Sequence, residues 1–402
     1  MSGGRVRVGP TSSSSGPAAS FDVDALLDDP TVGIVVCCGS GGVGKTTTAA
    51  ALALRAAERG RHVVVLTIDP ARRLAQAMGI AELDNTPRPV AGIDDAEGGS
   101  LEAMMLDMKR TFDEVVESQA SPERAKQILE NPFYVALSSS FAGTQEYMAM
   151  EKLGQLHADE HTASRPDGRY DLIVVDTPPS RSALDFLDAP ERLSSFLDGR
   201  FVRLMLTPAR GPARLVTAGF GLVTGALTKV LGAQVLRDLQ TFVAAIDTVF
   251  GGFRQRAMKT YALLQARGTA FVVVAAPEDD ALREAAYFVE RLSDDAMPLA
   301  GLVVNRAATL PAGDLSADEA VAAAVRLRKR DPRSPTAELL RLHADRARLA
   351  ERERRLRERF ATTHPQVPSV VVPALPSDVH DLDGLRRVGE LLGDGGTTAP
   401  PR

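Results

Sequence analysis

The chain has 402 residues, of which 44% are hydrophobic and 25% are charged, and its formal net charge is −5. This length is enough to bury a large core, and the composition is that of an ordinary globular protein. The acidic balance gives no bulk attraction to nucleic acid, so we expect no nucleic-acid partner. The two cysteines, Cys37 and Cys38, are adjacent, which excludes a disulfide framework or a cysteine zinc site.

The two ends of the chain differ in composition from the rest. Residues 1–20 and 393–402 are rich in small residues and proline, which predicts disordered tails. No signal-type segment and no apolar run long enough to span a bilayer stands out, so we expect a cytoplasmic protein that is not integral to a membrane. Between the tails we expect one domain over 21–392, with helical insertions at about 109–165 and 196–266.

The first predicted element, residues 31–39, is an apolar run rich in β-branched residues, typical of a strand buried on both faces. It leads into Gly39-Ser-Gly-Gly-Val-Gly-Lys-Thr46, which fits the pattern GxxxxGK followed by Ser or Thr, and then into an alanine-rich helix. In this context the inward N–H groups and the helix N-terminus bind nucleotide phosphates. Lys45 would reach the β- and γ-phosphates, and the Thr46 hydroxyl would bind Mg²⁺. The predicted phosphate-binding residues are Gly41, Gly42, Val43, Gly44, Lys45, Thr46 and Thr47.

A second buried strand, residues 61–69, ends at Asp69-Pro70, and a short helix follows to about Met78. Such a βαβ unit predicts a parallel sheet with its site at the carboxyl ends of the strands. Asp69 lies at such an end, although an Asp-Pro pair also ends strands as a simple turn. After a loop over 81–100, we expect a strand at 101–107 and several helices lying on top of the sheet.

The third signal is Tyr170-Asp-Leu-Ile-Val-Val-Asp176, a strand that ends in an acid. The Asp176 carboxylate is suited to hold Mg²⁺, through water, as in a Walker B motif. The residues that follow would lie beside the γ-phosphate and change conformation with it. The predicted switch residues are Asp69, Pro70, Thr177, Pro178 and Arg181.

Residues 196–266 are apolar and mostly helical in pattern, and their middle, residues 215–231, is apolar on nearly every face. One interpretation is a helix buried in the core or in an oligomer interface. The other is an apolar groove that binds a hydrophobic client, since exposed apolar surface marks interaction sites.

The last third of the chain predicts strands at 269–278 and 299–305, with a helix between them. Asn305, at a strand end, carries the paired donor and acceptor needed to read an adenine edge, or it caps a turn. Residues 307–335 form a polar insertion around one helix. A strand at 367–372 precedes a proline-rich loop and a final helix to about Leu392.

Residues 336–360 predict a charged helix with eight arginines and a stripe of Leu342, Leu349 and Leu356. The seven-residue spacing is that of a coiled coil, but the companion positions are polar. We interpret this segment as a solvated helix that packs one narrow edge, with contact to a partner or an acidic surface as the alternative.

In this order the motifs resemble the anion-transporting ATPase family, which includes the arsenical-pump and tail-anchored-protein-targeting ATPases. The resemblance runs from about Gly33 to Leu392 and is nearest to an actinobacterial branch encoded as paired paralogues. It implies an α/β fold of the P-loop NTPase type, of the deviant Walker A class, with a mostly parallel sheet flanked by helices and an inserted helical subdomain. Thr67-Ile-Asp-Pro-Ala71 is similar to the switch I segment T-D-P-A, and residues 176–184 to switch II.

The resemblance also implies roles for single residues. Asp69 would activate the attacking water, so that Asp69 and Lys45 are the predicted catalytic residues. Glu278 matches an acid that lies near the nucleotide across the dimer, and Asn305 matches the asparagine that reads adenine. The loop that covers the base corresponds to Pro373, Leu375 and Pro376. The implied cofactors are ATP or ADP and Mg²⁺.

Departures from the family pattern bear on assembly. Ser40 stands where the family's signature lysine would reach across a dimer, and the zinc-binding CxxC of the eukaryotic members is absent. Arg181-Ser182 replaces the usual Gly-His of switch II. From the missing lysine we infer a heterodimer with a paralogue that retains it, and favour a homodimer less.

The sequence therefore predicts an ATP hydrolase that couples its nucleotide state to a hydrophobic client or a membrane partner. Two alternatives are a nucleotide-binding scaffold with little hydrolysis and a subunit of an oxyanion-transport ATPase. The second lacks support from a cysteine triad or a second P-loop half. A partitioning ATPase of the same class is disfavoured by the acidic charge.

Overall fold

The structure is a computed structural model. It describes residues 20–68, 73–158 with gaps at 133, 136–137 and 139–143, 170–178, 253–310 and 315–395. Several predicted features lie outside the described residues, namely Asp69, Pro70, Arg181 and the apolar run 215–231.

Eight strands form a single sheet in the order β3-β4-β2-β5-β1-β6-β7-β8. All neighbouring pairs are parallel except β3 with β4. The bounds are β1 Ile34–Gly39, β2 His62–Thr67, β3 Arg88–Pro89, β4 Ser100–Met105, β5 Leu172–Asp176, β6 Thr269–Ala275, β7 Leu299–Ala307 and β8 Ser369–Pro373. The sheet confirms the predicted α/β class and places β1 between β5 and β6.

Both faces of the sheet are covered, because the central strands β1, β2, β5 and β6 are buried at nearly every position rather than at alternate ones. In β1, Ile34, Val36 and Cys38 contribute to one apolar layer, and Val35 and Cys37 to the other. One layer holds α1 Val23–Asp28, α2 Lys45–Glu58, α3 Arg73–Ala77 and α16 Leu382–Gly393. The other holds α4 Met108–Gln119, α5 Pro122–Leu129, α7 Thr144–Ala158, α12 Phe253–Leu264 and α13 Asp279–Asp294. Of the helices in the described ranges, none is both long and apolar enough to span a bilayer.

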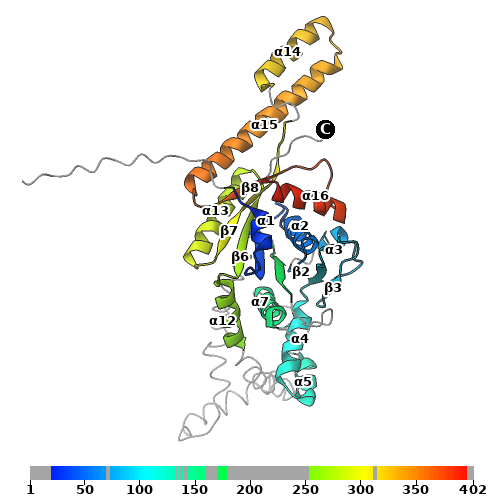
Figure 1. Cartoon of the computed structure of the whole chain (residues 1–402), viewed down its shortest axis with the longest axis vertical. Coiled ribbons are helices and arrows are strands. Elements are labelled where there is room, and N and C mark those ends of the chain that lie inside the picture. The colour runs from blue at the N-terminus through cyan, green and yellow to red at the C-terminus, as the bar shows by residue number, and fades with distance from the viewer. Residues whose placement is uncertain are drawn as a thin grey trace, which may run out of the picture.

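A helical hairpin of α14 (Ala317–Arg330) and α15 (Pro335–Thr363) projects from the body of the protein (Figure 1). Alanines such as Ala324 and Ala344 are buried on α14 and α15, which lets the two helices approach closely. The foot of α15 joins the core through the buried ring of Phe360. The predicted charged helix is therefore present, and within the described residues its contacts with the body come from its C-terminal part.

Two elements were not predicted. The helix α1 has only six residues, too few to show a period, and begins where Asp22 Oδ1 accepts the Ala25 N–H at 2.9 Å. The two-residue strand β3 lies inside the predicted loop 81–100 and exists only through its antiparallel pairing with β4. Both depend on neighbours that are distant in sequence, and a local pattern does not reveal them.

Candidate nucleotide-binding site

The glycine loop lies at the carboxyl end of β1 and leads directly into α2. Gly44 is the N-cap of α2 and has φ +96°, a conformation that residues with a Cβ rarely adopt. A Cβ at this position would lie 2.2 Å from Nδ2 of Asn305. The positive φ therefore favours glycine here, and a larger residue would also displace the side chain of Asn305.

Lys45 is almost fully buried, with 6% of its surface exposed. Its Nζ donates a hydrogen bond of 2.8 Å to the carbonyl oxygen of Ser40. The ammonium group is thus folded back over the glycine loop, at the first turn of α2, where the helix dipole also favours an anion. The contact of Lys45 with the β- and γ-phosphates stays a prediction.

Asp176 is completely buried at the end of β5, and the sheet register sets it beside Cys37 of β1 and Thr67 of β2. Its Oδ2 accepts hydrogen bonds from the hydroxyl of Thr46 at 2.8 Å and from that of Thr67 at 2.9 Å. The structure therefore brings together the two predicted metal-binding residues, 130 positions apart in sequence. Sequence reasoning did not assign Thr67 to the site, although it lies at the end of a strand and begins the segment that is similar to switch I.

Thr177 follows Asp176 and is tied to the central strand. Its hydroxyl donates to the Cys37 carbonyl at 2.8 Å, and its backbone N–H reaches the same oxygen at 3.3 Å.

Burial, together with the nearby Asp176 carboxylate, raises the pKa of the Cys37 thiol, so this cysteine stays neutral. Pro178 is buried as well. The described start of the predicted switch is therefore part of the core.

Asn305, at the end of β7, contacts the glycine loop. Its Nδ2 donates to the Val43 carbonyl at 2.9 Å, and its Oδ1 accepts the N–H of Arg306 at 2.9 Å. The loop predicted to cover the base is anchored beside it, because the N–H of Ala374 bonds the Ala307 carbonyl at 2.9 Å. Leu375 packs partly against the core, whereas Pro376 is exposed. Adenine reading by this region stays a prediction.

A hollow of about 370 Å³ borders the outer side of the glycine loop. Glu278, which is exposed at the start of α13, faces this hollow together with Ser40. Carboxylates predominate among its charged residues, which are Glu278, Asp280, Glu284, Arg306 and Glu353.

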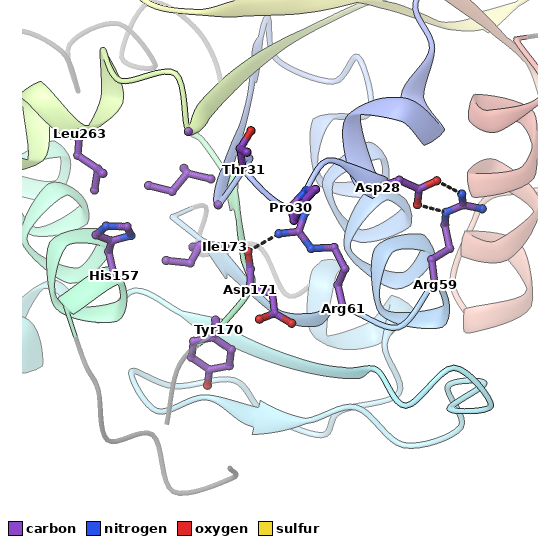
Figure 2. A pocket seen from close by; sticks show the side chains of 13 residues that line it. Asp28, Pro30, Thr31, Arg59, Arg61, His157, Tyr170, Asp171, Ile173 and Leu263 are labelled. Carbon is purple, nitrogen blue, oxygen red and sulfur yellow. Dashed lines mark hydrogen bonds and ion pairs between the residues drawn. The ribbon is translucent and has the colours of Figure 1, made fainter. Parts of the chain in front are cut away.

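A second hollow, of about 550 Å³, lies at the opposite end of the strands, where β1 and β5 begin (Figure 2). Arg61 reaches across its wall and donates to the carbonyls of Asp171 and of Val32, the latter at 2.8 Å. Arg59 pairs there with Asp28. Arg61 therefore fastens the loop before β1 to the start of β5. None of the predicted site residues that the structure describes lines this hollow.

A comparison with known families matches residues 32–329 to the model described as "Anion-transporting ATPase". This match covers well over half of the chain. The chain belongs to the anion-transporting ATPase family. It is accordingly an ATPase by class, as the motifs predicted, and its family implies a bound nucleotide.

Individual relatives of this anion-transporting ATPase are distant. The "ATPase ASNA1 homolog" of Cryptosporidium parvum is 27% identical over 296 residues, covering 72% of this chain and 71% of the relative. The "ATPase get3" of Neurospora crassa is 26% identical over 288 residues, covering 71% and 76%. The "Arsenical pump-driving ATPase" of Acidiphilium multivorum is 29% identical over 162 residues, which span 40% of this chain but only 26% of that relative.

The side chains of this ATPase fit the magnesium ion that the family implies. A hydroxyl and a carboxylate meet at 2.8 Å between Thr46 and Asp176, and both offer the oxygen ligands that Mg²⁺ prefers. With the ion bound, these two groups would hold it beside the phosphates, where it would neutralise charge on the phosphate oxygens. Ser40, by contrast, takes part in the loop through its carbonyl oxygen, which accepts the hydrogen bond from Lys45 Nζ.

Proposed function

We propose that this protein is a Mg²⁺- and ATP-dependent molecular switch that hydrolyses ATP to ADP and phosphate. The observation that carries the proposal is the contact of 2.8 Å between Thr46 and Asp176, next to the buried Lys45. A cation, a hydroxyl and a carboxylate converge at the N-terminus of α2, the arrangement required to neutralise phosphates and orient them. We assign to Asp69 the orientation of the attacking water.

The test measures phosphate release and nucleotide affinity with the purified full-length chain. Lys45→Ala should abolish tight binding of Mg-ATP, and Asp176→Asn should abolish its magnesium dependence. Lys126→Ala is a matched control, because the side chain of Lys126 is 75% exposed on α5 and pairs only weakly, with Glu130 at 4.0 Å. Its binding and turnover should equal those of the wild type.

The scaffold alternative predicts a different result. If the protein binds nucleotide only as a structural element, Lys45→Ala and Asp69→Asn should leave its slow turnover unchanged. A rate of phosphate release that is the same in the wild type and in both variants would therefore reject hydrolysis and favour the scaffold.

We further propose that the functional unit is a heterodimer with a paralogous P-loop ATPase, acting in the cytoplasm on a hydrophobic client or a membrane partner. The support is Ser40, since a symmetric homodimer would lack the lysine that reaches the partner's nucleotide. Affinity capture of the tagged chain from its host in the presence of ATP, followed by native mass spectrometry, tests this. A 1:1 complex with a lysine-bearing paralogue is expected, and a clean homodimer would contradict it.

A further inference from the structure

The end of β7 holds the glycine loop through two consecutive carbonyl groups. Asn305 Nδ2 donates to the Val43 oxygen at 2.9 Å, and Arg306 Nη1 donates to the Gly42 oxygen at 3.0 Å. Neighbouring carbonyls of one loop are thus bound by neighbouring side chains of one strand, which lies more than 260 positions away in sequence.

This contact constrains the donors of the loop as well as its acceptors. The peptide bonds here are trans, so the C=O and N–H of each peptide plane point in opposite directions. The oxygens of Gly42 and Val43 are drawn towards β7. The N–H groups in the same two planes, those of Val43 and Gly44, therefore point away from β7, the orientation that a phosphate needs.

The backbone of Arg306 is itself unusual. Its φ is +61°, and it is one of two non-glycine residues with positive φ in the described ranges, the other being Ala296. The pairing of β7 with β8 shifts register between Val304 and Ala307, so that Arg306 lies on a bulge. Bulges re-aim side chains next to functional sites, and unfavourable backbone conformations persist where the surroundings hold them.

The surroundings do hold this bulge on both sides. The N–H of Arg306 is bound by Asn305 Oδ1, and the N–H of Ala308 is bound by the Glu353 carboxylate of α15 at 2.6 Å. The carbonyl of Ala307 accepts from Ala374 at 2.9 Å. The bulge is therefore a fixed point where α15, the loop after β8 and the glycine loop meet.

We propose that Arg306 is a positioning residue for nucleotide phosphates. Its guanidinium fixes the peptide plane between Gly42 and Val43 and so aims the Val43 N–H at the phosphate. This inference rests on the proposed function, because it takes the glycine loop to be a phosphate site. Arg306 acts on the loop and not on the phosphate, so its loss weakens binding without removing any phosphate ligand.

The decisive variant is Arg306→Asn. Asparagine tolerates a left-handed backbone better than most residues, so the bulge should survive, but its side chain is too short to reach Gly42. The expected result is an affinity for Mg-ADP, measured by calorimetry, that is about three- to ten-fold weaker, corresponding to one hydrogen bond. The midpoint of thermal unfolding without nucleotide should stay that of the wild type. Arg306→Lys, which keeps a donor, should recover part of the affinity.

The kinetic readout separates positioning from a merely structural role. Because the loop holds the phosphates in both the ground state and the transition state, Arg306→Asn should raise KM for ATP while changing kcat less. Arg283→Asn is the matched control. Arg283 is 71% exposed on α13 and pairs with Asp280, so this variant removes the same charge near the same hollow without touching the loop.

The outcomes are distinguishable. Wild-type affinity in Arg306→Asn would overturn the inference, as would an equal loss in Arg283→Asn or no recovery in Arg306→Lys. If the wild type itself fails to bind Mg-ADP, or if Lys45→Ala binds as well as the wild type, the proposed phosphate site is rejected. The inference about Arg306 is then rejected as well, because it rests on that site.

Discussion

At the carboxyl end of the sheet the charged side chains of Lys45 and Asp176 are buried and hydrogen-bonded, whereas most charged side chains of the α14–α15 hairpin are exposed to water and pair with one another. Asp176 has no exposed surface, and Lys45 has 6%. On α15, by contrast, Arg354 bonds Glu351 at 2.8 Å and also pairs with Glu358, all three being well exposed. Burying a charge is costly unless it is paired, while an exposed pair contributes little. We therefore interpret the buried charges at the carboxyl ends of the strands as part of the nucleotide site, and the exposed charges of the hairpin as groups that keep its surface solvated.

The hairpin also differs from the rest of the chain in net charge. Residues 316–363 contain thirteen Arg or Lys against eight Asp or Glu, a net charge of +5 in a chain whose total is −5. The rest of the protein is therefore at −10. A basic hairpin projects from an acidic body, so the contact with an acidic surface that the sequence offered as an alternative stays a hypothesis about the hairpin alone.

The largest expected effect contrasts the two ends of one helix. Phe360 is buried at the foot of α15, and Phe360→Ala should lower the free energy of unfolding by about 3–5 kcal/mol. Leu342 is 55% exposed on the projecting part, and Leu342→Ala should change it by less than about 0.5 kcal/mol. Urea denaturation of both variants measures this. Similar losses would mean that the projecting part of α15 is packed in solution.

The next effect concerns the glycine loop. In Gly44→Ala, the new Cβ would clash with Nδ2 of Asn305, and the residue would also keep a positive φ. We expect a loss of about 2–3 kcal/mol in stability and greatly weakened nucleotide binding. Gly42→Ala is the control, because its φ is also positive but a Cβ there meets nothing within 4 Å. Its cost should be only about 1–2 kcal/mol, and a cost equal to that of Gly44→Ala would refute the contact with β7.

A smaller effect is expected at the start of the hairpin. Ser316 caps α14 in a reciprocal capping box with Glu319. Ser316→Ala should destabilise the helix by about 1 kcal/mol. Hydrogen exchange should then accelerate in α14 and stay unchanged in α2, since the nucleotide site does not depend on this cap. Faster exchange in both helices would show that the hairpin and the site unfold together.

The smallest effect is a pH dependence at the junction of the two regions. Burial raises the pKa of Glu353 above its ordinary value of 4.5, with Glu278 adding to the rise. Its stabilising contribution is thus present below pH 4.5 and is lost as the pH rises through the raised pKa. Glu353→Gln keeps an acceptor for Ala308 without the charge, so at pH 7 it should be at least as stable as the wild type, an advantage that disappears towards pH 4.

Glu351→Gln provides the control of opposite sign for this titration. Hydrogen bonds from Arg354 and Arg355 lower the pKa of Glu351 to about 2, so its contribution is present above pH 4.5 and is lost as the pH falls towards 2. Because this carboxylate is exposed, water screens the effect. Thermal unfolding should therefore be followed between pH 2 and 7. Relative to the wild type, Glu353→Gln should gain stability as the pH rises above 4.5, and Glu351→Gln should lose stability as the pH rises from 2 to 4.5. Curves of both variants that stay parallel to that of the wild type would contradict the assignment.

Much of the phosphate site could be predicted, because its signals are local. The glycine loop, the strand before it and the helix after it are contiguous, and Asp176 closes an apolar run typical of a buried strand. The pairing of Thr46 with Asp176 also followed, since parallel strands bring their carboxyl ends to one edge. The role of Asn305 was harder to foresee, because its contact with Val43 depends on how far β7 extends beyond β1.

The sequence alone therefore determined the α/β class, the phosphate loop and the family. The class follows from the apolar patterns of strands and helices, and the loop and the family follow from short motifs and their order along the chain. The tertiary structure decided the rest. Thr67 reaches Asp176 only because β2 and β5 are neighbours in the sheet, and Arg306 reaches Gly42 only because a bulge turns its side chain. The length of α15 was readable, but its projection was not. Such contacts join residues far apart in the chain, and packing rather than local preference selects them.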